Sequence, residues 1–268
     1  MTAIVTALAT TPVKGLRVVA QPELTLESSG APDNRRFYVV DERGWMVNGK
    51  TIGALSTVVA DYRRDDRSLT LTFSDGEVVT GTVQLGEPID TRFFSRPAVA
   101  RPVLGAWSGA LSEHVGRTLR LVESIGRPGV DRGQRGAVSL ISRASLSGLA
   151  HAAGVQEVDA RRFRMLIEID GVVAHAEDAW IGTRVRVGGT LVRFAGHVGR
   201  CLVTSRHPES GLVDLPTLDL LRSYRAGLDT TEPLAFGIYG EVLEGGVVAV
   251  GDAVVPAARG GTPSASSC

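Results

Sequence analysis

The hydrophobic pattern along the chain favours short β-strands over helices. Runs rich in Val, Thr and Leu alternate with turns that contain Gly, Pro, Asp and Asn. Residues 68–73 alternate strictly between polar and apolar side chains, and the Ser-Asp-Gly that follows has the composition of a hairpin turn. Short strands at this spacing are typical of a small barrel or sandwich. The other predicted strands are 3–8, 23–27, 37–41, 78–83, 163–169, 184–187, 190–194, 201–205, 235–243, 247–250 and 253–255.

Two segments in the second half of the chain carry helix signals. Ser142 is a suitable N-cap for a helix over 143–153, which Gly154 would end. A second helix is predicted to begin at Asp214 or Leu215 and to end at Tyr224, with Pro216 in its first turn. The sequence therefore predicts a mainly β protein with short helices.

The strand pattern breaks after residue 95, where two prolines and a glycine fall close together. We expect two β-dominated domains that meet across a cleft, and such clefts commonly hold cofactors. The last residues are rich in Gly, Ser, Ala and Pro and are expected to be disordered. The expected division is an N-terminal β-barrel domain over 1–95, a linker over 96–110, a second domain over 111–257 and a tail over 258–268.

Composition narrows the functional classes. The chain has 268 residues with 29 Lys and Arg against 29 Asp and Glu, which argues against binding to nucleic acid by bulk phosphate attraction. No uncharged apolar run approaches the roughly 18 residues of a membrane span, and the start of the chain lacks the basic region of a secretory signal. Two cysteines make no disulfide framework. We therefore expect a cytoplasmic protein with no nucleic-acid or membrane partner.

Lysine is almost absent from the basic residues. Only Lys14 and Lys50 are lysines, and each lies next to a glycine. A coding preference for arginine with chance placement explains this pattern. The alternative is that both places need a compact point charge on a flexible stem, as at a phosphate.

The densest chemical stretch surrounds Cys201. Arg200 precedes it, and His197 and His207 flank it. A nearby cation favours the thiolate, which is a nucleophile and a ligand for soft metals; a small buried hydrophobe is the alternative. Zinc is weakly supported because the spacing is irregular and no second cysteine pair is present. The chain has no phosphate-binding loop of the Walker type and no dinucleotide-binding glycine pattern.

Several arginines could meet at a phosphate-bearing ligand. If 163–169 is a strand that begins a little earlier, Arg162 and Arg164 point to one face and need an anion or carboxylates, for which Glu177 and Asp178 are candidates. The loop over 127–133 is a lid or, alternatively, a plain surface loop. The basic residues in question are Lys14, Arg35, Arg36, Lys50, Arg161, Arg162, Arg164 and Arg200.

Taken together, four stretches resemble the MOSC family, in the arrangement where an N-terminal β-barrel domain precedes the MOSC domain. The resemblance implies a small N-terminal barrel and a barrel-like MOSC domain. The stretches are 11–15 (Thr-Pro-Val-Lys-Gly), 34–41 with 44–48, 163–164 with 176–182, and 200–204 with 208–211 and 221–225.

The resemblance implies a molybdenum cofactor, with a more weakly implied association with pyridoxal phosphate. It points to a reductase of N-hydroxylated or N-oxidised small molecules that receives electrons from a separate donor protein. Cys201 matches the family's metal ligand and would be the catalytic residue. The residues implied to bind the cofactor are Lys14, Arg35, Asn48, Lys50, Ser142, Arg164, Arg200 and Cys201.

The chain also departs from the family pattern. Met165 and Leu166 replace a Pro-Asn pair, and Val198 stands where many relatives have a second cysteine. Asn34 replaces an aspartate, and His207 stands where relatives often have one. Two alternatives therefore remain: a non-enzymatic carrier of cofactor or sulfur on Cys201, and a barrel that has lost the cofactor and mediates interactions.

Overall fold

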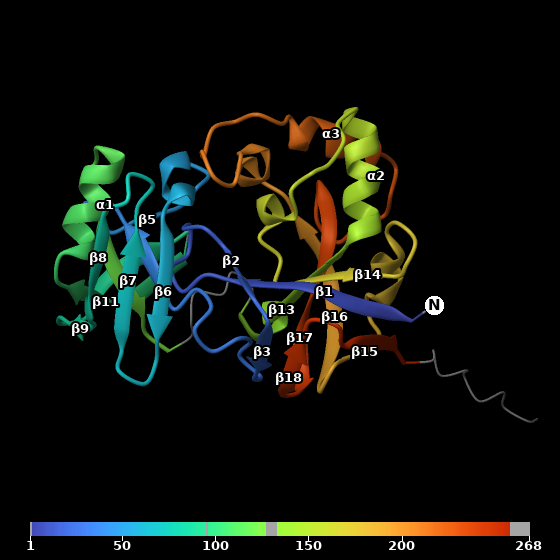
Figure 1. Ribbon diagram of the computed structural model, residues 1–268, viewed down its shortest axis with the longest axis horizontal. Coiled ribbons are helices and arrows are strands. Elements are labelled where there is room, and N and C mark those ends of the chain that lie inside the picture. The colour runs from blue at the N-terminus through green and yellow to red at the C-terminus, as the bar shows by residue number, and fades with distance from the viewer. Residues whose placement is uncertain (1, 95, 127–132, 258–268) are drawn as a thin grey trace, which may run out of the picture.

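The computed structural model describes residues 2–94, 96–126 and 133–257, and the expected tail over 258–268 lies outside them. Two β-rich bodies lie side by side (Figure 1), which we call the N-terminal module and the C-terminal barrel. The mainly β fold with short helices is confirmed.

The C-terminal barrel closes on itself with seven strands. Its strands surround a core that includes Leu8, Phe194 and Ile238, all fully or almost fully buried. Closure leaves the barrel without a free edge, because the last strand of the series pairs with the first. In spatial order the strands are β1 (Ala3–Thr10), β14 (Ile167–Asp170), β13 (Val138–Ser142), β17 (Ala235–Glu244), β16 (Thr190–Gly199), β15 (Arg184–Val187) and β19 (Ala253–Pro256).

The first strand of the chain belongs to this C-terminal barrel. Strand β1 pairs with β14 on one side and β19 on the other. Strand β2 (Val19–Gln21) pairs with β1, and β3 (Glu23–Leu26) pairs with β18 (Gly246–Ala249). The chain thus starts in the barrel, crosses to the N-terminal module and later returns. Residues 11–18, between β1 and β2, lie where the two bodies meet, because Val13 bridges to Phe37 and packs into the core of the N-terminal module.

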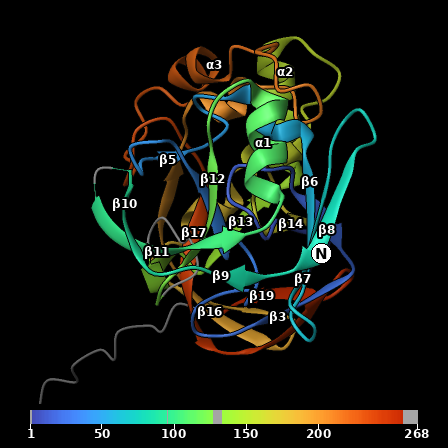
Figure 2. The same cartoon turned by 90° about the vertical axis from the view of Figure 1, so that its left-hand side faces the viewer.

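Two sheets and one helix form the N-terminal module, seen in front in Figure 2. Helix α1 (Trp107–Val115) packs Trp107 and Leu111 into a core that also contains Phe37 and Leu69. The larger sheet contains β10 (Ile89–Phe93), β11 (Arg96–Leu104), β12 (Arg120–Ser124), β4 (Phe37–Val40) and β5 (Met46–Val47), with β9 (Gln84–Leu85) on β11, and the smaller contains β6 (Val59–Arg63), β7 (Ser68–Thr72) and β8 (Val78–Thr82).

The structure differs from the expected linker over 96–110. This segment is strand β11 and the beginning of α1, and β12 follows in the same sheet. Pro97 lies opposite Arg92, and Pro102 lies opposite Val122. A proline removes one ladder donor but keeps an extended backbone, so the strand continues through both.

Local signals located the main helix correctly. Helix α2 covers Arg143–Ala153, the Ser142 hydroxyl accepts from the N–H of Ser145, and Gly154 ends the helix at a φ of 67°. Helix α3 covers Thr217–Tyr224 after Pro216. No helix among the described residues is long and apolar enough to cross a membrane.

One predicted strand was wrong, and another was wrong in its first half. Residues 201–205 form the 3-10 helix η5 (Leu202–Ser205) instead of a strand. The segment from 163 begins with the end of η3 (Ala160–Phe163), and β14 starts only at Ile167. Other 3-10 turns are η1 (Gly53–Thr57), η2 (Gly133–Gly136) and η4 (Ala176–Trp180).

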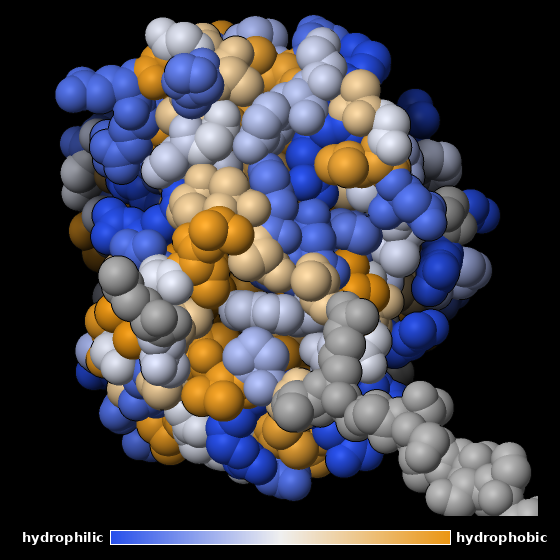
Figure 3. All heavy atoms as spheres, turned by 90° about the vertical axis from the view of Figure 1, so that its right-hand side faces the viewer, coloured by the Kyte–Doolittle hydropathy of each residue, from blue (hydrophilic) through white to orange (hydrophobic). Residues whose placement is uncertain are grey.

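On the outer face of the C-terminal barrel, small hydrophobic areas lie among hydrophilic ones (Figure 3).

Candidate functional site

A cavity of about 540 Å³ lies where the two bodies meet, and we call it the junction cleft. Both bodies contribute to its lining: Asn48 and Phe94 come from the N-terminal module, and Arg164 and Cys201 come from the C-terminal barrel. All but one of the site residues implied by the resemblance line it. These are Lys14, Arg35, Asn48, Lys50, Arg164, Arg200 and Cys201.

The thiol of Cys201 is free and exposed in the junction cleft. Strand β16 ends at Gly199, and Cys201 caps η5 with an extended backbone. Its carbonyl oxygen accepts the N–H and the hydroxyl of Thr204, both at 3.0 Å. The main chain is thus fixed while the side chain faces the cleft, which differs from the buried alternative considered from the sequence.

The side chain of Arg200, which precedes Cys201 in the chain, is fixed by the barrel wall. Its Nε donates to the carbonyl oxygen of Phe236 at 2.8 Å, and Nη1 donates to that of Phe163 at 3.0 Å. Its Nη2 donates to Met165 Sδ at 3.0 Å, and the guanidinium lies 5.1 Å from the Phe163 ring centroid. Met165, one of the departures from the family pattern, therefore positions a cation of the cleft.

Two further arginines of the cleft have an unusual backbone conformation. Arg35 has a φ of 60° and Arg164 has a φ of 55°. A left-handed conformation is uncommon for residues with a side chain, and such outliers concentrate at functional sites. The Arg164 guanidinium donates to the carbonyl oxygen of Leu16 at 2.6 Å, which ties the barrel to the junction segment.

Both lysines of the chain line the same cleft. Lys14 is only 7% exposed, and its Nζ lies 5.4 Å from the Phe93 ring centroid and 5.5 Å from that of Phe94. Among the lining residues that the structure describes, Glu232 is the single carboxylate. The lysines and arginines are Lys14, Arg17, Arg35, Lys50, Arg161, Arg162, Arg164, Arg200 and Arg206. The cleft is therefore strongly cationic, which favours an anionic ligand.

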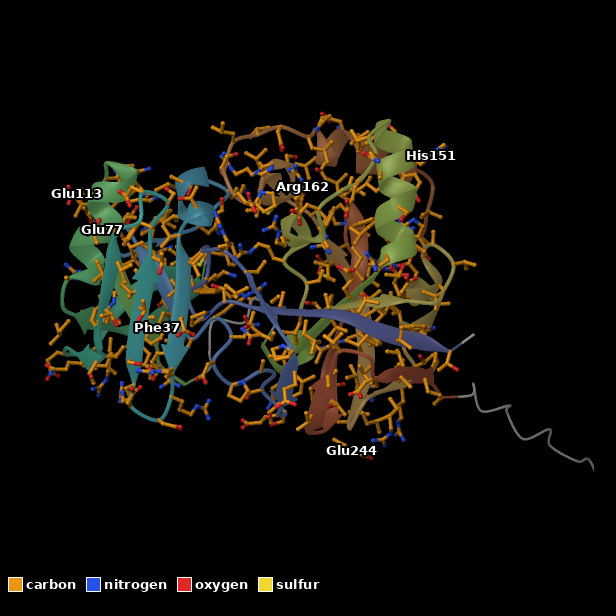
Figure 4. All side chains as sticks on the ribbon, viewed as in Figure 1. Phe37, Glu77, Glu113, His151, Arg162 and Glu244 are labelled. Atoms are coloured by element: carbon orange, nitrogen blue, oxygen red, sulfur yellow. The ribbon has the colours of Figure 1, made fainter. Side chains whose placement is uncertain are left out.

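The expected partnership of Arg162 and Arg164 on one strand face was wrong. Arg162 lies in a 3-10 turn and binds Asp214 through two parallel hydrogen bonds of 2.6 and 2.7 Å. These bonds lower the pKa of Asp214. Figure 4 shows Arg162 on the side of the barrel that faces the N-terminal module. Neighbouring Arg161 pairs with Asp159.

Ser142 does not reach the junction cleft. It is fully buried, and its N–H and hydroxyl donate to the carboxylate of Glu177 at 3.1 and 2.9 Å. Ser145 donates to the same carboxylate at 2.7 Å. The protein's own anion thus occupies this helix N-terminus. Asp178, the other expected partner of the arginines, binds Arg225 at 2.5 Å instead.

The two histidines near Cys201 have different surroundings. His197 is buried, its Nδ1 accepts the N–H of Thr231 at 3.2 Å, and burial lowers its pKa. His207 lines the cleft, and its Nδ1 accepts the N–H of Glu209 at 3.2 Å. In the part of the chain that the structure describes, no three His, Cys, Asp or Glu side chains form a metal cluster. Of the proposed lid, residues 127–132 lie outside the described residues.

Sequence reasoning missed several lining residues. Phe94 gave no signal beyond its place in a hydrophobic pair, and Arg17 and Tyr239 gave none at all. Their roles depend on contacts between distant segments.

These features define a two-module β protein whose cationic cleft presents a free thiol. A model of the MOSC N-terminal beta barrel domain matches residues 2–98, and a model of the MOSC domain matches residues 128–255. The chain belongs to the MOSC family and carries both domains.

The chain is also similar to individual proteins. It is 25% identical to mitochondrial amidoxime-reducing component 1 of Xenopus laevis, over 96% of this chain and 83% of the relative. The YUAD protein of Bacillus subtilis has 13% identity and a TM-score of 0.46, with 97% of this chain and 98% of that one covered. YiiM of Geobacillus stearothermophilus has 16% identity and a TM-score of 0.37, with 76% and 75% covered. The family is associated with the molybdenum cofactor.

Proposed function

We propose that this protein is a molybdenum-cofactor-dependent reductase of N-hydroxylated or N-oxidised compounds, with Cys201 as the protein ligand of the metal. The exposed thiol of Cys201 in a cationic cleft is the observation that carries the proposal. The name of the amphibian relative supports an amidoxime as the substrate class.

The residues of the cleft fit such a cofactor. A thiolate suits a metal that a dithiolene otherwise holds, and the exposed thiol of Cys201 faces the cleft. Lys14, Arg35 and Arg164 offer cations to an anionic pterin phosphate. Asn48 and Lys50 would complete the site from the N-terminal module, and Ser142 takes no part.

When bound, the cofactor supplies two-electron redox chemistry at the metal. The overall reaction breaks one N–O bond, consumes two electrons and two protons, and releases water. The cleft binds and orients the substrate. In the neutral ring of His207 the hydrogen is on Nε2, because Nδ1 accepts the N–H of Glu209.

Electrons come from a separate protein in this proposal. The relative's name describes one component of a reducing system, which supports such a donor. We place the protein in the cytoplasm, where a reducing environment keeps the Cys201 thiol free.

The test measures molybdenum and pterin in protein expressed with cofactor biosynthesis intact. Wild type and Cys268→Ala, which alters the other cysteine of the sequence, should both contain the cofactor and reduce an amidoxime with a chemical electron donor. Cys201→Ser should lose the metal. Wild type without molybdenum would overturn the proposal.

The exposure of Cys201 also favours a second function, a carrier that delivers the cofactor to another protein. A carrier would contain molybdenum and pterin and lose the metal in Cys201→Ser. It would reduce no amidoxime with any chemical donor, and it would transfer its cofactor to an apo-enzyme.

A further inference from the structure

Phe94 has a backbone conformation that its residue type disfavours. Strand β10 ends at Phe93, which pairs with Arg96 of β11, so Phe94 begins a tight turn. Such short connections favour Gly, Asn or Asp because they require a positive φ. Phe94 has a φ of 56°, and the residue is 51% exposed. Burial therefore does not explain why a bulky ring occupies this position.

The orientation of the Phe94 ring is restricted by consecutive edge-on contacts between aromatic rings. It meets Phe93 edge-on at 5.3 Å and 86°, and Phe93 meets Tyr38 at 5.2 Å and 88°. Tyr38 is buried, and its hydroxyl is 2.7 Å from that of Thr91. Phe94 is thus anchored through the core of the N-terminal module while part of its ring stays exposed.

The exposed ring lines the junction cleft together with Cys201. The ammonium of Lys14 lies 5.5 Å from its centroid. A cation within about 6 Å of a ring is attracted to it, so Lys14 further restricts the ring. An anchored aromatic surface in a cleft offers a place for a second flat ring to stack at low entropic cost.

We propose that Phe94 is an aromatic platform against which a planar π-ring ligand lies in the junction cleft. This inference rests on the proposed function. The planar ring has two possible sources, the pterin of the cofactor and an aromatic group of the substrate. Lys14 and the hairpin position the platform, and Phe94 itself contacts the ligand.

The experiment compares a flat and a puckered probe. Calorimetry measures the binding of benzamidoxime and of cyclohexanecarboxamidoxime to the cofactor-loaded protein, and molybdenum and pterin contents are determined in parallel. The variants are Phe94→Leu, which removes the ring but stays apolar, and Phe94→Trp, which keeps a ring. Trp45→Leu is the matched control, because Trp45 is 50% exposed, bridges to Arg92 of β10 and does not line the cleft.

If the substrate is the source, Phe94→Leu lowers the preference for the flat probe by roughly 2- to 12-fold at unchanged cofactor content. If the pterin is the source, Phe94→Leu lowers the cofactor content several-fold. In both cases Phe94→Trp restores the property and Trp45→Leu leaves it unchanged. If Phe94→Leu alters neither property, the inference is overturned.

A stability measurement separates this role from a structural one. Phe94→Asn places a residue that tolerates the left-handed conformation in the turn, so the melting temperature should stay the same or rise. A marked fall would show that the ring serves the hairpin and would overturn the inference.

The two proposals fail separately. If wild type reduces the amidoxime but Phe94→Leu changes neither selectivity nor cofactor content, only the Phe94 proposal is overturned. If Phe94→Leu abolishes ring-selective binding but wild type shows no turnover, only the reductase proposal is overturned.

Discussion

The guanidinium of Arg35 donates a hydrogen bond of 3.2 Å to the main-chain carbonyl oxygen of Arg164, which lies 129 residues further along the chain. Both residues have a left-handed backbone conformation. Arg164 in turn donates to the carbonyl oxygen of Leu16. These two cations therefore connect the C-terminal barrel to the segments that lead into the N-terminal module.

Replacing Arg164 should weaken both stability and cofactor retention. Arg164→Asn keeps a residue that tolerates the left-handed backbone but removes the guanidinium. The loss of a charged hydrogen bond should lower the free energy of unfolding by about 1.5–3 kcal/mol, measured by urea denaturation. Arg193→Asn, on the outer strand pair with Glu241, is the control and should cost less than about 1 kcal/mol. Equal losses in both variants would contradict this role for Arg164.

The pair of Arg162 and Asp214 should respond unequally to the loss of either partner. Arg162 has a side chain that is 8% exposed, whereas that of Asp214 is 37% exposed. Asp214→Asn leaves a buried guanidinium without its carboxylate and should cost about 2 kcal/mol, below the range for fully buried pairs. Arg162→Met leaves a carboxylate that water can solvate and should cost less. Urea denaturation of both variants measures the difference, and the reverse order would contradict the burial argument.

Ser142 should matter for stability and not for the cofactor. Ser142→Ala removes the N-cap of α2 and one donor to Glu177, so the free energy of unfolding should fall by about 1–2 kcal/mol. The molybdenum content of the folded protein should remain that of wild type. A selective loss of molybdenum at unchanged stability would return Ser142 to the cofactor site.

His175 should make the stability depend on pH. Burial, aided by the charge of Arg225, lowers the pKa of His175 from 6.5 to about 4. Between these values the unfolded chain binds a proton that the folded chain does not. The free energy of unfolding should therefore fall as the pH drops from 6.5 towards 4, and this contribution should be constant above that window.

The matching variants are His175→Asn, which cannot titrate, and His151→Asn on the exposed face of α2. Urea denaturation between pH 4 and 7.5 should show a shallower dependence in His175→Asn than in wild type. His151→Asn should keep the wild-type slope. His197, whose pKa is also lowered, remains in all three proteins, so the difference reports on His175. Parallel curves for all three would contradict the prediction.

The alternating strand over Ser68–Thr72 and the helix over Arg143–Ala153 were predictable because their signals are local. Alternation at Ser68–Thr72, the cap at Ser142 and the left-handed stop at Gly154 each act within a few residues. The prolines of β11 misled the prediction, because a proline breaks a strand only where its missing N–H or fixed φ conflicts with the neighbours.

The candidate site was predictable to the extent that motifs carried it. The resemblance to the MOSC family grouped Lys14, Lys50, Arg200 and Cys201 into one site, and all four line one cleft. The partners of the arginines were not predictable. Arg162 binds Asp214 across 52 residues, and nothing in the local pattern favours this carboxylate over Glu177.

By itself, the sequence determined the β-rich class, the capped helix and the residue types gathered near Cys201, because these follow from short-range periodicity and side-chain chemistry. Only the tertiary structure decided that β1 closes the C-terminal barrel and that Cys201 is exposed. It also decided that the Ser142 hydroxyl donates to the Glu177 carboxylate and that Phe94 lines the cleft. Each of these depends on contacts between segments that are distant along the chain. Such contacts depend on the packing of the whole molecule, and the local sequence around each residue does not indicate them.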